Sequence, residues 1–140
     1  MAGKKIPQIY CSMIKIDDLA IYMASSKNGA VRTGITLEAN PDCVEYFKAL
    51  FPESNISKSP KMNNALAEAI DKKLHGTAAE SVPVDLGITE FQREILERIA
   101  MIPFGETRTY GDIARITGRP GGARAIGQVM NKNPLPVIYP

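Results

Sequence analysis

The sequence has 140 residues, of which 44% are hydrophobic and 23% charged, and its net charge is +2. These values are typical of one or two small globular domains and exclude a disordered chain, a collagen and a coiled coil. No apolar run is long enough to cross a bilayer, and no apolar segment behind the charged N-terminus resembles a signal peptide. We therefore expect an intracellular protein without a membrane partner.

Two cysteines and one histidine are too few for a closed zinc site or a disulfide framework. We expect no metal and no cofactor. Basic residues gather late in the sequence, because residues 113–140 contain no acidic residue but hold Arg115, Arg119, Arg124 and Lys132. This stretch favours a surface that faces a polyanion, although an ordinary solvated face is the alternative.

The first part of the sequence predicts a sheet followed by helices. Asn28-Gly29 is a strong hairpin signal. β-forming stretches indicate an antiparallel meander of three strands, at residues 6–16, 19–24 and 31–37. Asn40-Pro41 and Ser59-Pro60 each predict a helix start, Gly76 predicts a helix end, and residues 76–83 read as a linker.

The second part of the sequence predicts three helices. Thr89 can cap a helix over residues 90–102. Two further helices, over 111–117 and 123–131, flank a glycine-rich break, which is the layout of a helix-turn-helix. We expect Ile113 and Ile116 to face inward, together with Ile126, Val129 and Met130. The other side of the last helix offers Ala123, Arg124 and Gly127, a smooth face suited to lying close against a groove or, alternatively, against another helix.

Between residues 87 and 140, a series of motifs runs in order and without gaps. The motifs are Phe91-Gln92, Ile102-Pro103-Phe104-Gly105-Glu106-Thr107, Thr109-Tyr110, Ala123-Arg124-Ala125-Ile126-Gly127 and Asn131-Lys132-Asn133-Pro134-Leu135-Pro136-Val137-Ile138. In this series the sequence resembles the alkylguanine–DNA alkyltransferases, also called methylated-DNA–protein-cysteine methyltransferases. Over residues 1–86 the resemblance is architectural.

The resemblance implies an α+β fold. Residues 1–82 would form a ribonuclease-H-like domain, an antiparallel sheet with helices. Residues 83–140 would form a DNA-binding domain with a winged-helix-like helix-turn-helix, truncated before the active-site cysteine. The implied function is DNA repair, in which alkylated guanine is flipped out of double-stranded DNA and its alkyl group moves to a protein cysteine.

The resemblance also assigns roles to individual residues. Tyr110 would crowd the phosphate of the target nucleotide and help to rotate it, and Arg124 would fill the space that the base leaves. Further residues implied in the DNA interface are Ala123 and Gly127, which approach the minor groove, and Thr109 beside Tyr110. Asn133 would support the active site, because it joins the last helix to the active-site loop and holds the turn between them. The alternatives are a buried Tyr110 and an Arg124 that is only a surface cation.

In the family, the proline at the position of Pro140 precedes the acceptor cysteine of a Pro-Cys-His-Arg motif. That cysteine would follow Pro140, so we expect these 140 residues to be inactive in transfer. Cys11 and Cys43 fall in apolar stretches, where free cysteines are buried and inert. We expect His75 to interact with a helix dipole rather than act as a base.

Three functions follow as hypotheses: a repair alkyltransferase, a non-catalytic protein that binds the lesion, and a regulator that reads the major groove. The last is disfavoured, because alanine, isoleucine, glycine and valine are poor at reading base edges. We expect a monomer that binds DNA through the minor groove. Residues 137–139 predict a short buried strand, and a missing C-terminal segment or a partner chain would complete the fold and raise its stability.

Overall fold

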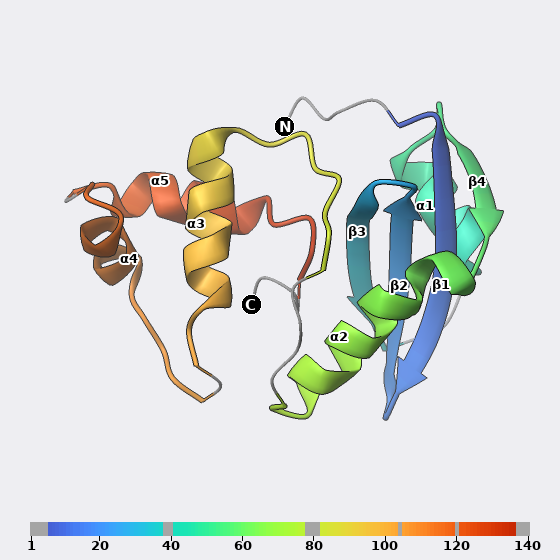
Figure 1. The fold of residues 1–140 in the computed structure, drawn as a ribbon, viewed down its shortest axis with the longest axis horizontal. Coiled ribbons are helices and arrows are strands. Elements are labelled where there is room, and N and C mark those ends of the chain that lie inside the picture. Colours follow the sequence, from blue (N-terminus) through green and yellow to red (C-terminus); the bar gives the residue numbers. More distant parts are fainter. Residues whose placement is uncertain (1–5, 38–40, 78–81, 104, 120, 137–140) are drawn as a thin grey trace.

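A computed structural model describes residues 6–37, 41–77, 82–103, 105–119 and 121–136 (Figure 1). The elements in chain order are β1 (Gln8–Ile16), β2 (Leu19–Ser26), β3 (Gly29–Thr36), α1 (Cys43–Leu50), β4 (Asn55–Lys58), the 3-10 turn η1 (Lys61–Asn63), α2 (Asn64–Leu74), α3 (Glu90–Ala100), α4 (Tyr110–Ile116) and α5 (Ala123–Asn131). We call residues 6–77 the sheet lobe and residues 82–136 the helical lobe. The mixed α+β class predicted from the sequence is confirmed.

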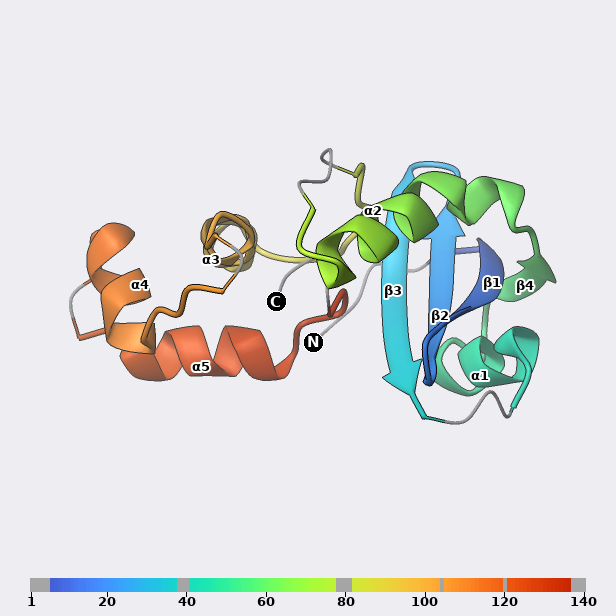
Figure 2. The same cartoon turned by 90° about the horizontal axis from the view of Figure 1, so that it is seen from below.

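The sheet has the strand order β3-β2-β1-β4. The first three strands form the predicted antiparallel meander, whereas β4, which the sequence did not predict, pairs with β1 in parallel. Helices α1 and α2 cover opposite faces of this sheet (Figure 2). Strand β2 is therefore buried on both sides: Tyr22 packs in the cluster of Phe47 from α1, and Met23 in the cluster of Leu66 from α2.

Two helix starts in the sheet lobe differ from the prediction. Helix α1 begins two residues later than Asn40-Pro41 suggested, because Asp42 is the N-cap and accepts a hydrogen bond from the amide of Val44, 2.7 Å away. Asn40 itself lies outside the described residues. Ser59-Pro60 leads into the turn η1 before α2 begins at Asn64.

The helical lobe contains the three predicted helices. Thr89 caps α3 in a reciprocal capping box with Gln92, as its sequence position indicated, although α3 ends at Ala100. The expectation for Ile116 was wrong, since this side chain is 52% exposed. At about 100° per residue, position 116 lies roughly 110° from the midpoint of the buried pair Ile113 and Ala114. Ile126 and Val129 are buried, as expected.

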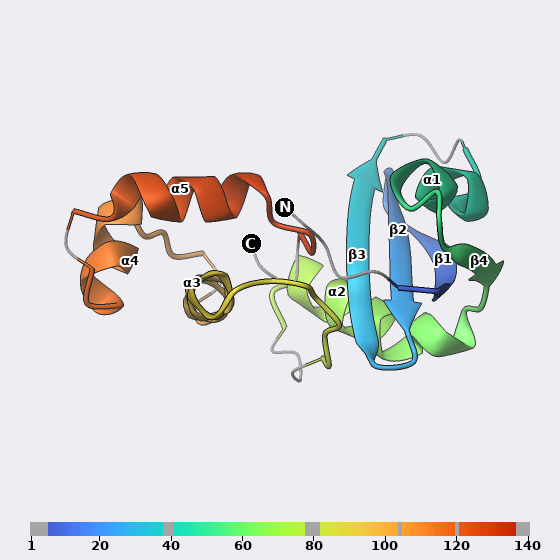
Figure 3. The same cartoon turned by 90° about the horizontal axis from the view of Figure 1, so that it is seen from above.

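The two lobes meet at the free edge of β3, which lies nearer the helical lobe than the other strands (Figure 3). Ala30 donates its amide to Pro83 and accepts from the amide of Asp85, at 2.9 and 2.8 Å. Thr33 donates its amide to Pro134 and its hydroxyl to Pro136, at 2.9 and 3.1 Å. Two segments of the helical lobe thus cover an edge that would otherwise expose unpaired backbone groups.

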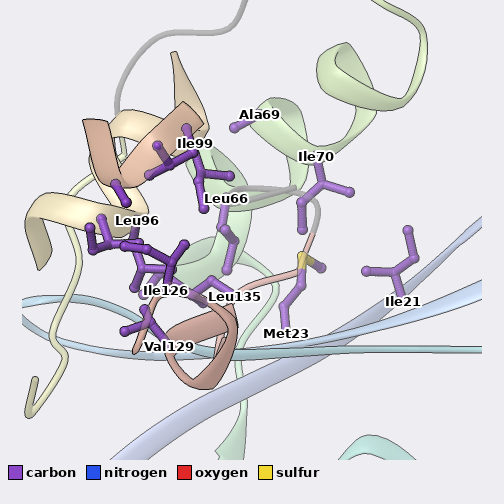
Figure 4. Close-up of a cluster of buried hydrophobic side chains, with 14 residues drawn as sticks. Ile21, Met23, Leu66, Ala69, Ile70, Leu96, Ile99, Ile126, Val129 and Leu135 are labelled. Atoms are coloured by element: carbon purple, nitrogen blue, oxygen red, sulfur yellow. The ribbon is translucent and has the colours of Figure 1, made fainter. Parts of the chain in front are cut away.

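One hydrophobic cluster continues across this junction. It joins Met23 and Leu66 of the sheet lobe with Ile126 and Leu135 of the helical lobe (Figure 4). The end of the predicted linker is accordingly not a free tether, because Pro83 is fixed against β3. The strand predicted at residues 137–139 lies outside the described residues. Across the described part, no helix has the length and apolar character needed to span a membrane.

Candidate nucleic-acid interface

Helices α4 and α5 are joined by a tight turn, which confirms the predicted helix-turn-helix. Gly118 and Gly121 in this turn have φ angles of +74° and +85°, a backbone region that glycine adopts at little cost. Helix α5 runs from the outer end of the molecule toward the edge of the sheet (Figure 3). Its first turn therefore lies at the end of the molecule remote from the sheet lobe.

Thr109 fixes the start of α4. Its hydroxyl oxygen accepts from the amide of Asp112, and its amide donates to the Asp112 carboxylate, both at 3.0 Å. These hydrogen bonds from Thr109 hold the pKa of Asp112 below its usual range. The Thr109 side chain is thus used as a helix cap, and its contact with DNA stays a prediction. The cap defines the position of Tyr110, the first residue of α4.

Tyr110 is half exposed, at 50%, so the alternative of a buried tyrosine was wrong. Its ring lies against α5 at Gly127: a Cβ atom built on Gly127 would meet Tyr110 Cε2 at 3.2 Å and Cδ2 at 3.4 Å. The structure therefore brings together two of the predicted residues from different helices. Ala123 stands one helical turn before Gly127 on the same side of α5, and it is half-buried.

Arg124 is exposed, and its guanidinium makes no ion pair or hydrogen bond with the described residues. Two other arginines of the acid-free stretch are neutralised by acids from earlier in the chain. Arg119 pairs with Glu94 at 3.0 Å and lies over the ring of Phe91, and Arg115 pairs with Asp112. The charge pattern along the sequence therefore predicted a larger positive surface than the structure shows. Among these three arginines, Arg124 is the one whose charge is not neutralised by a described acid.

Asn133 holds the turn after α5, because its side-chain oxygen accepts from the amide of Leu135 at 3.0 Å. The turn leads the chain into the junction, where Leu135 is fully buried and the carbonyls of Pro134 and Pro136 accept from Thr33. A cleft of about 760 Å³ lies beside this turn and is lined from both lobes. No sequence pattern predicted this cleft, because its walls come from segments that are distant from one another in the chain.

The two cysteines lie in the sheet lobe, away from this interface, and both are buried. Cys11 and Cys43 are buried between β1 and α1, with their sulfur atoms 3.0 Å apart. Burial, followed by the hydrogen bond with Cys43, raises the pKa of Cys11 to about 12. Because the thiolate is the nucleophilic form, Cys11 is unsuited to attack. Their predicted burial is confirmed.

His75 ends α2 as its C-cap, with Nδ1 2.8 Å from the carbonyl oxygen of Asp71. This placement agrees with the expected position at a helix C-terminus. Among the described residues, no three histidine, cysteine or acidic side chains come together in a way that could hold a metal ion.

The chain is similar to known proteins both in its helical lobe and, in longer alignments, over most of its length. Residues 90–140 match the family model described as "6-O-methylguanine DNA methyltransferase, DNA binding domain". An inducible methylated-DNA–protein-cysteine methyltransferase of Bacillus subtilis is 29% identical over 135 residues, which are 96% of this chain and 75% of that protein. A methylated-DNA–protein-cysteine methyltransferase of Archaeoglobus fulgidus is 32% identical over 119 residues, covering 84% and 76%.

The fold is also similar to that of solved structures. Mycobacterium tuberculosis OGT, solved in complex with DNA, superposes with a TM-score of 0.69 and 25% identity, covering 95% of this chain and 74% of the other. The ribonuclease-H-like sheet with a helical DNA-binding domain, as expected from the sequence, is therefore confirmed at the level of the fold.

Proposed function

The chain belongs to the methylated-DNA–protein-cysteine methyltransferase family, and on that premise we propose that its helical lobe binds duplex DNA and turns an alkylated guanine out of the helix. One observation carries the proposal. Arg124, exposed and without an ion pair to any residue that the structure describes, stands on the same helix as Gly127, and the half-exposed ring of Tyr110 lies against that glycine.

The proposed contact is the minor groove, entered by α5. This groove is about 6 Å wide, so that a helix can approach it only through small side chains. Ala123 and Gly127 give α5 such a side, and Arg124 is the long side chain beside them. A regulator that reads the major groove is not favoured, because this side of α5 offers little that distinguishes base pairs.

Base flipping requires two separate actions, which we assign to the side chains of Tyr110 and Arg124. Turning a nucleotide out of the stack costs a few kcal/mol, since stacking and pairing are lost. We assign Tyr110 to displacing the phosphate of the target nucleotide, and Arg124 to filling the space left in the duplex. The planar guanidinium recovers part of the lost stacking and keeps its charge near the phosphates.

Alkyl transfer needs a thiolate beside the flipped base, which Cys11 and Cys43 do not supply because they are buried in the sheet lobe. We assign the acceptor to a cysteine placed directly after Pro140. The sulfur would attack the alkyl carbon on guanine O6 and form a C–S bond, while the C–O bond breaks and guanine is released. The 140 residues alone would then bind the lesion without repairing it.

The same residues would serve a non-catalytic protein that binds the lesion, which is the second candidate. Incubation with O6-methylguanine duplex followed by intact-mass measurement separates the two. A mass gain of one methyl group on a chain carrying Cys-His-Arg after Pro140 supports the alkyltransferase, and no gain supports the binding protein.

We further propose that the chain has two domains, residues 1–82 and 83–140, that it is a monomer, and that it is located inside the cell.

The decisive test of DNA binding is the Arg124→Ala variant, compared with Arg98→Ala. Arg98 is exposed on α3, so that this control removes the same charge from the helical lobe. We expect R124A to weaken binding to an O6-methylguanine duplex about 10- to 100-fold, or about 1–3 kcal/mol, and R98A to change it little. Affinity is measured by fluorescence anisotropy at several salt concentrations, because phosphate contacts are weakened by salt.

Arg124→Lys refines this test, since lysine keeps the charge but lacks the planar group. If Arg124 fills the space left in the duplex, the affinity of R124K for the lesion duplex is closer to that of R124A than to that of the wild type. Equal affinities of the wild type, R124A and R98A for the lesion duplex would contradict the proposal.

A further inference from the structure

Gly127 lies in the middle of α5, where its backbone does not require glycine. Its φ angle is not among the positive values of the described glycines, and the helix is regular on both sides. Glycine in a helix interior is less stable than alanine. The position therefore carries a cost to α5 that the backbone geometry does not explain.

Contact with Tyr110 supplies a reason. A Cβ on Gly127 would lie 3.2, 3.4 and 4.0 Å from Cε2, Cδ2 and Cζ of the Tyr110 ring. The first distance is tighter than an ordinary contact and the second lies at its lower limit, so that the ring would have to shift by a few tenths of an ångström. By comparison, a Cβ on Gly111 would meet nothing closer than the Thr109 hydroxyl at 3.7 Å.

We propose that Gly127 is a positioning residue: because it has no side chain, the ring of Tyr110 can lie directly against α5 and is fixed there. We call this contact the seat of the Tyr110 ring. The inference rests on the proposed function and deepens it. Tyr110 is held from two directions: the Thr109 cap sets its backbone at the start of α4, and Gly127 sets its ring. Within the described residues, its hydroxyl makes no hydrogen bond that could replace this seat.

The seat couples the two side chains that act on DNA. Arg124 projects from α5, and the Tyr110 ring rests on the same helix three residues further on. Their separation is thus fixed within a single helix and does not depend on the turn between α4 and α5. A methyl group at position 127 pushes the ring out of register with Arg124, which impairs rotation of the nucleotide more than it impairs attachment to DNA.

A double-mutant cycle with Gly127→Ala, Tyr110→Ala and the double variant tests the seat. The readout is the fluorescence of 2-aminopurine placed beside O6-methylguanine in a duplex, recorded at saturating protein, so that it reports unstacking rather than affinity. We expect G127A to lower the flipping equilibrium roughly two- to tenfold, while its melting temperature stays equal or rises. In the Y110A background, the same substitution has no further effect. Gly111→Ala, the matched control, flips as the wild type does.

Each other outcome has a distinct meaning. An equal loss from G127A with and without Tyr110 overturns the seat, because it shows that the methyl group clashes with DNA directly. Wild-type flipping by G127A also overturns it. Wild-type flipping by Y110A itself contradicts the proposed function instead, since Tyr110 would then have no role in rotating the base.

Discussion

The two lobes each place a tyrosine ring against a glycine, in opposite surroundings. In the sheet lobe, Tyr46 lies over the buried Gly34 of β3, where an added Cβ would overlap the tyrosine hydroxyl. Tyr46 also stacks on Tyr22, with ring centroids 4.2 Å apart, and meets Phe47 edge-on at 5.0 Å. In the helical lobe, Tyr110 lies against Gly127 with half of its surface in solvent.

The difference shows how surroundings decide the use of a local contact. Tyr46 is held by two aromatic neighbours, Tyr22 and Phe47, so its glycine contributes to packing. Tyr110 leaves half of its surface available to a ligand and depends on Gly127 for its place. We therefore expect changes at the first pair to alter stability and changes at the second pair to alter DNA handling.

Gly34→Ala is expected to have the largest effect on stability. The added methyl group overlaps the Tyr46 hydroxyl in a packed region, and overpacking of this kind costs about 1–3 kcal/mol. Urea unfolding followed by circular dichroism measures the loss. Folded G34A should still flip the base as the wild type does. A G34A protein of wild-type stability, or one that loses flipping while folded, would break the contrast between the lobes.

The buried thiol of Cys11 predicts a pH dependence of the sheet lobe. Its pKa is raised from about 9 to about 12 in the folded chain, so between these values the unfolded chain loses a proton that the folded chain keeps. Stability therefore falls as pH rises above about 9, by at most about 1.4 kcal/mol per pH unit from this group. Urea unfolding at pH 8 to 10.5 measures the slope.

Cys11→Ala should flatten that slope, whereas Ile21→Val, which also trims the core of the sheet lobe, should keep it. If both variants show the slope of the wild type, Cys11 is not the group that titrates.

Thr33→Val sharpens the comparison at the junction itself. The variant keeps the hydrogen bond from the backbone amide to Pro134 but loses the hydrogen bond from the side-chain hydroxyl to Pro136. The partly buried carbonyl of Pro136 is then left without this donor, at a cost of about 1 kcal/mol. Thr33→Ser keeps the hydroxyl and should lie closer to the wild type. Thermal unfolding compares the two, and equal melting temperatures would show that the hydroxyl does not hold the lobes together.

Local signals in the sequence predicted much of the fold. Asn28-Gly29 marked the hairpin, and Thr89 marked the start of α3, because turn and cap chemistry depend on a few adjacent residues. Strand β4 was missed, since it is four residues long and mostly exposed, and pairs with a strand about fifty residues earlier. The direction of Ile116 was wrong because a two-turn helix defines its buried face poorly.

The candidate site was predicted residue by residue, but its arrangement was not. Tyr110, Arg124 and Gly127 came from motif resemblance, whereas the seat of the tyrosine ring on Gly127 depends on how α4 crosses α5. The pairing of Arg119 with Glu94 likewise depends on a contact between α3 and the turn before α5. Such contacts join residues distant in sequence, which composition and periodicity do not report.

The unstacking of a neighbouring base is the most direct measure of base flipping by Tyr110 and Arg124. Saturating wild-type protein is added to a duplex that carries O6-methylguanine beside 2-aminopurine, and the fluorescence is recorded together with the bound fraction. We expect the fluorescence to rise with the wild type and to rise much less with Arg124→Ala at the same bound fraction. Complete binding with no rise would contradict this expectation.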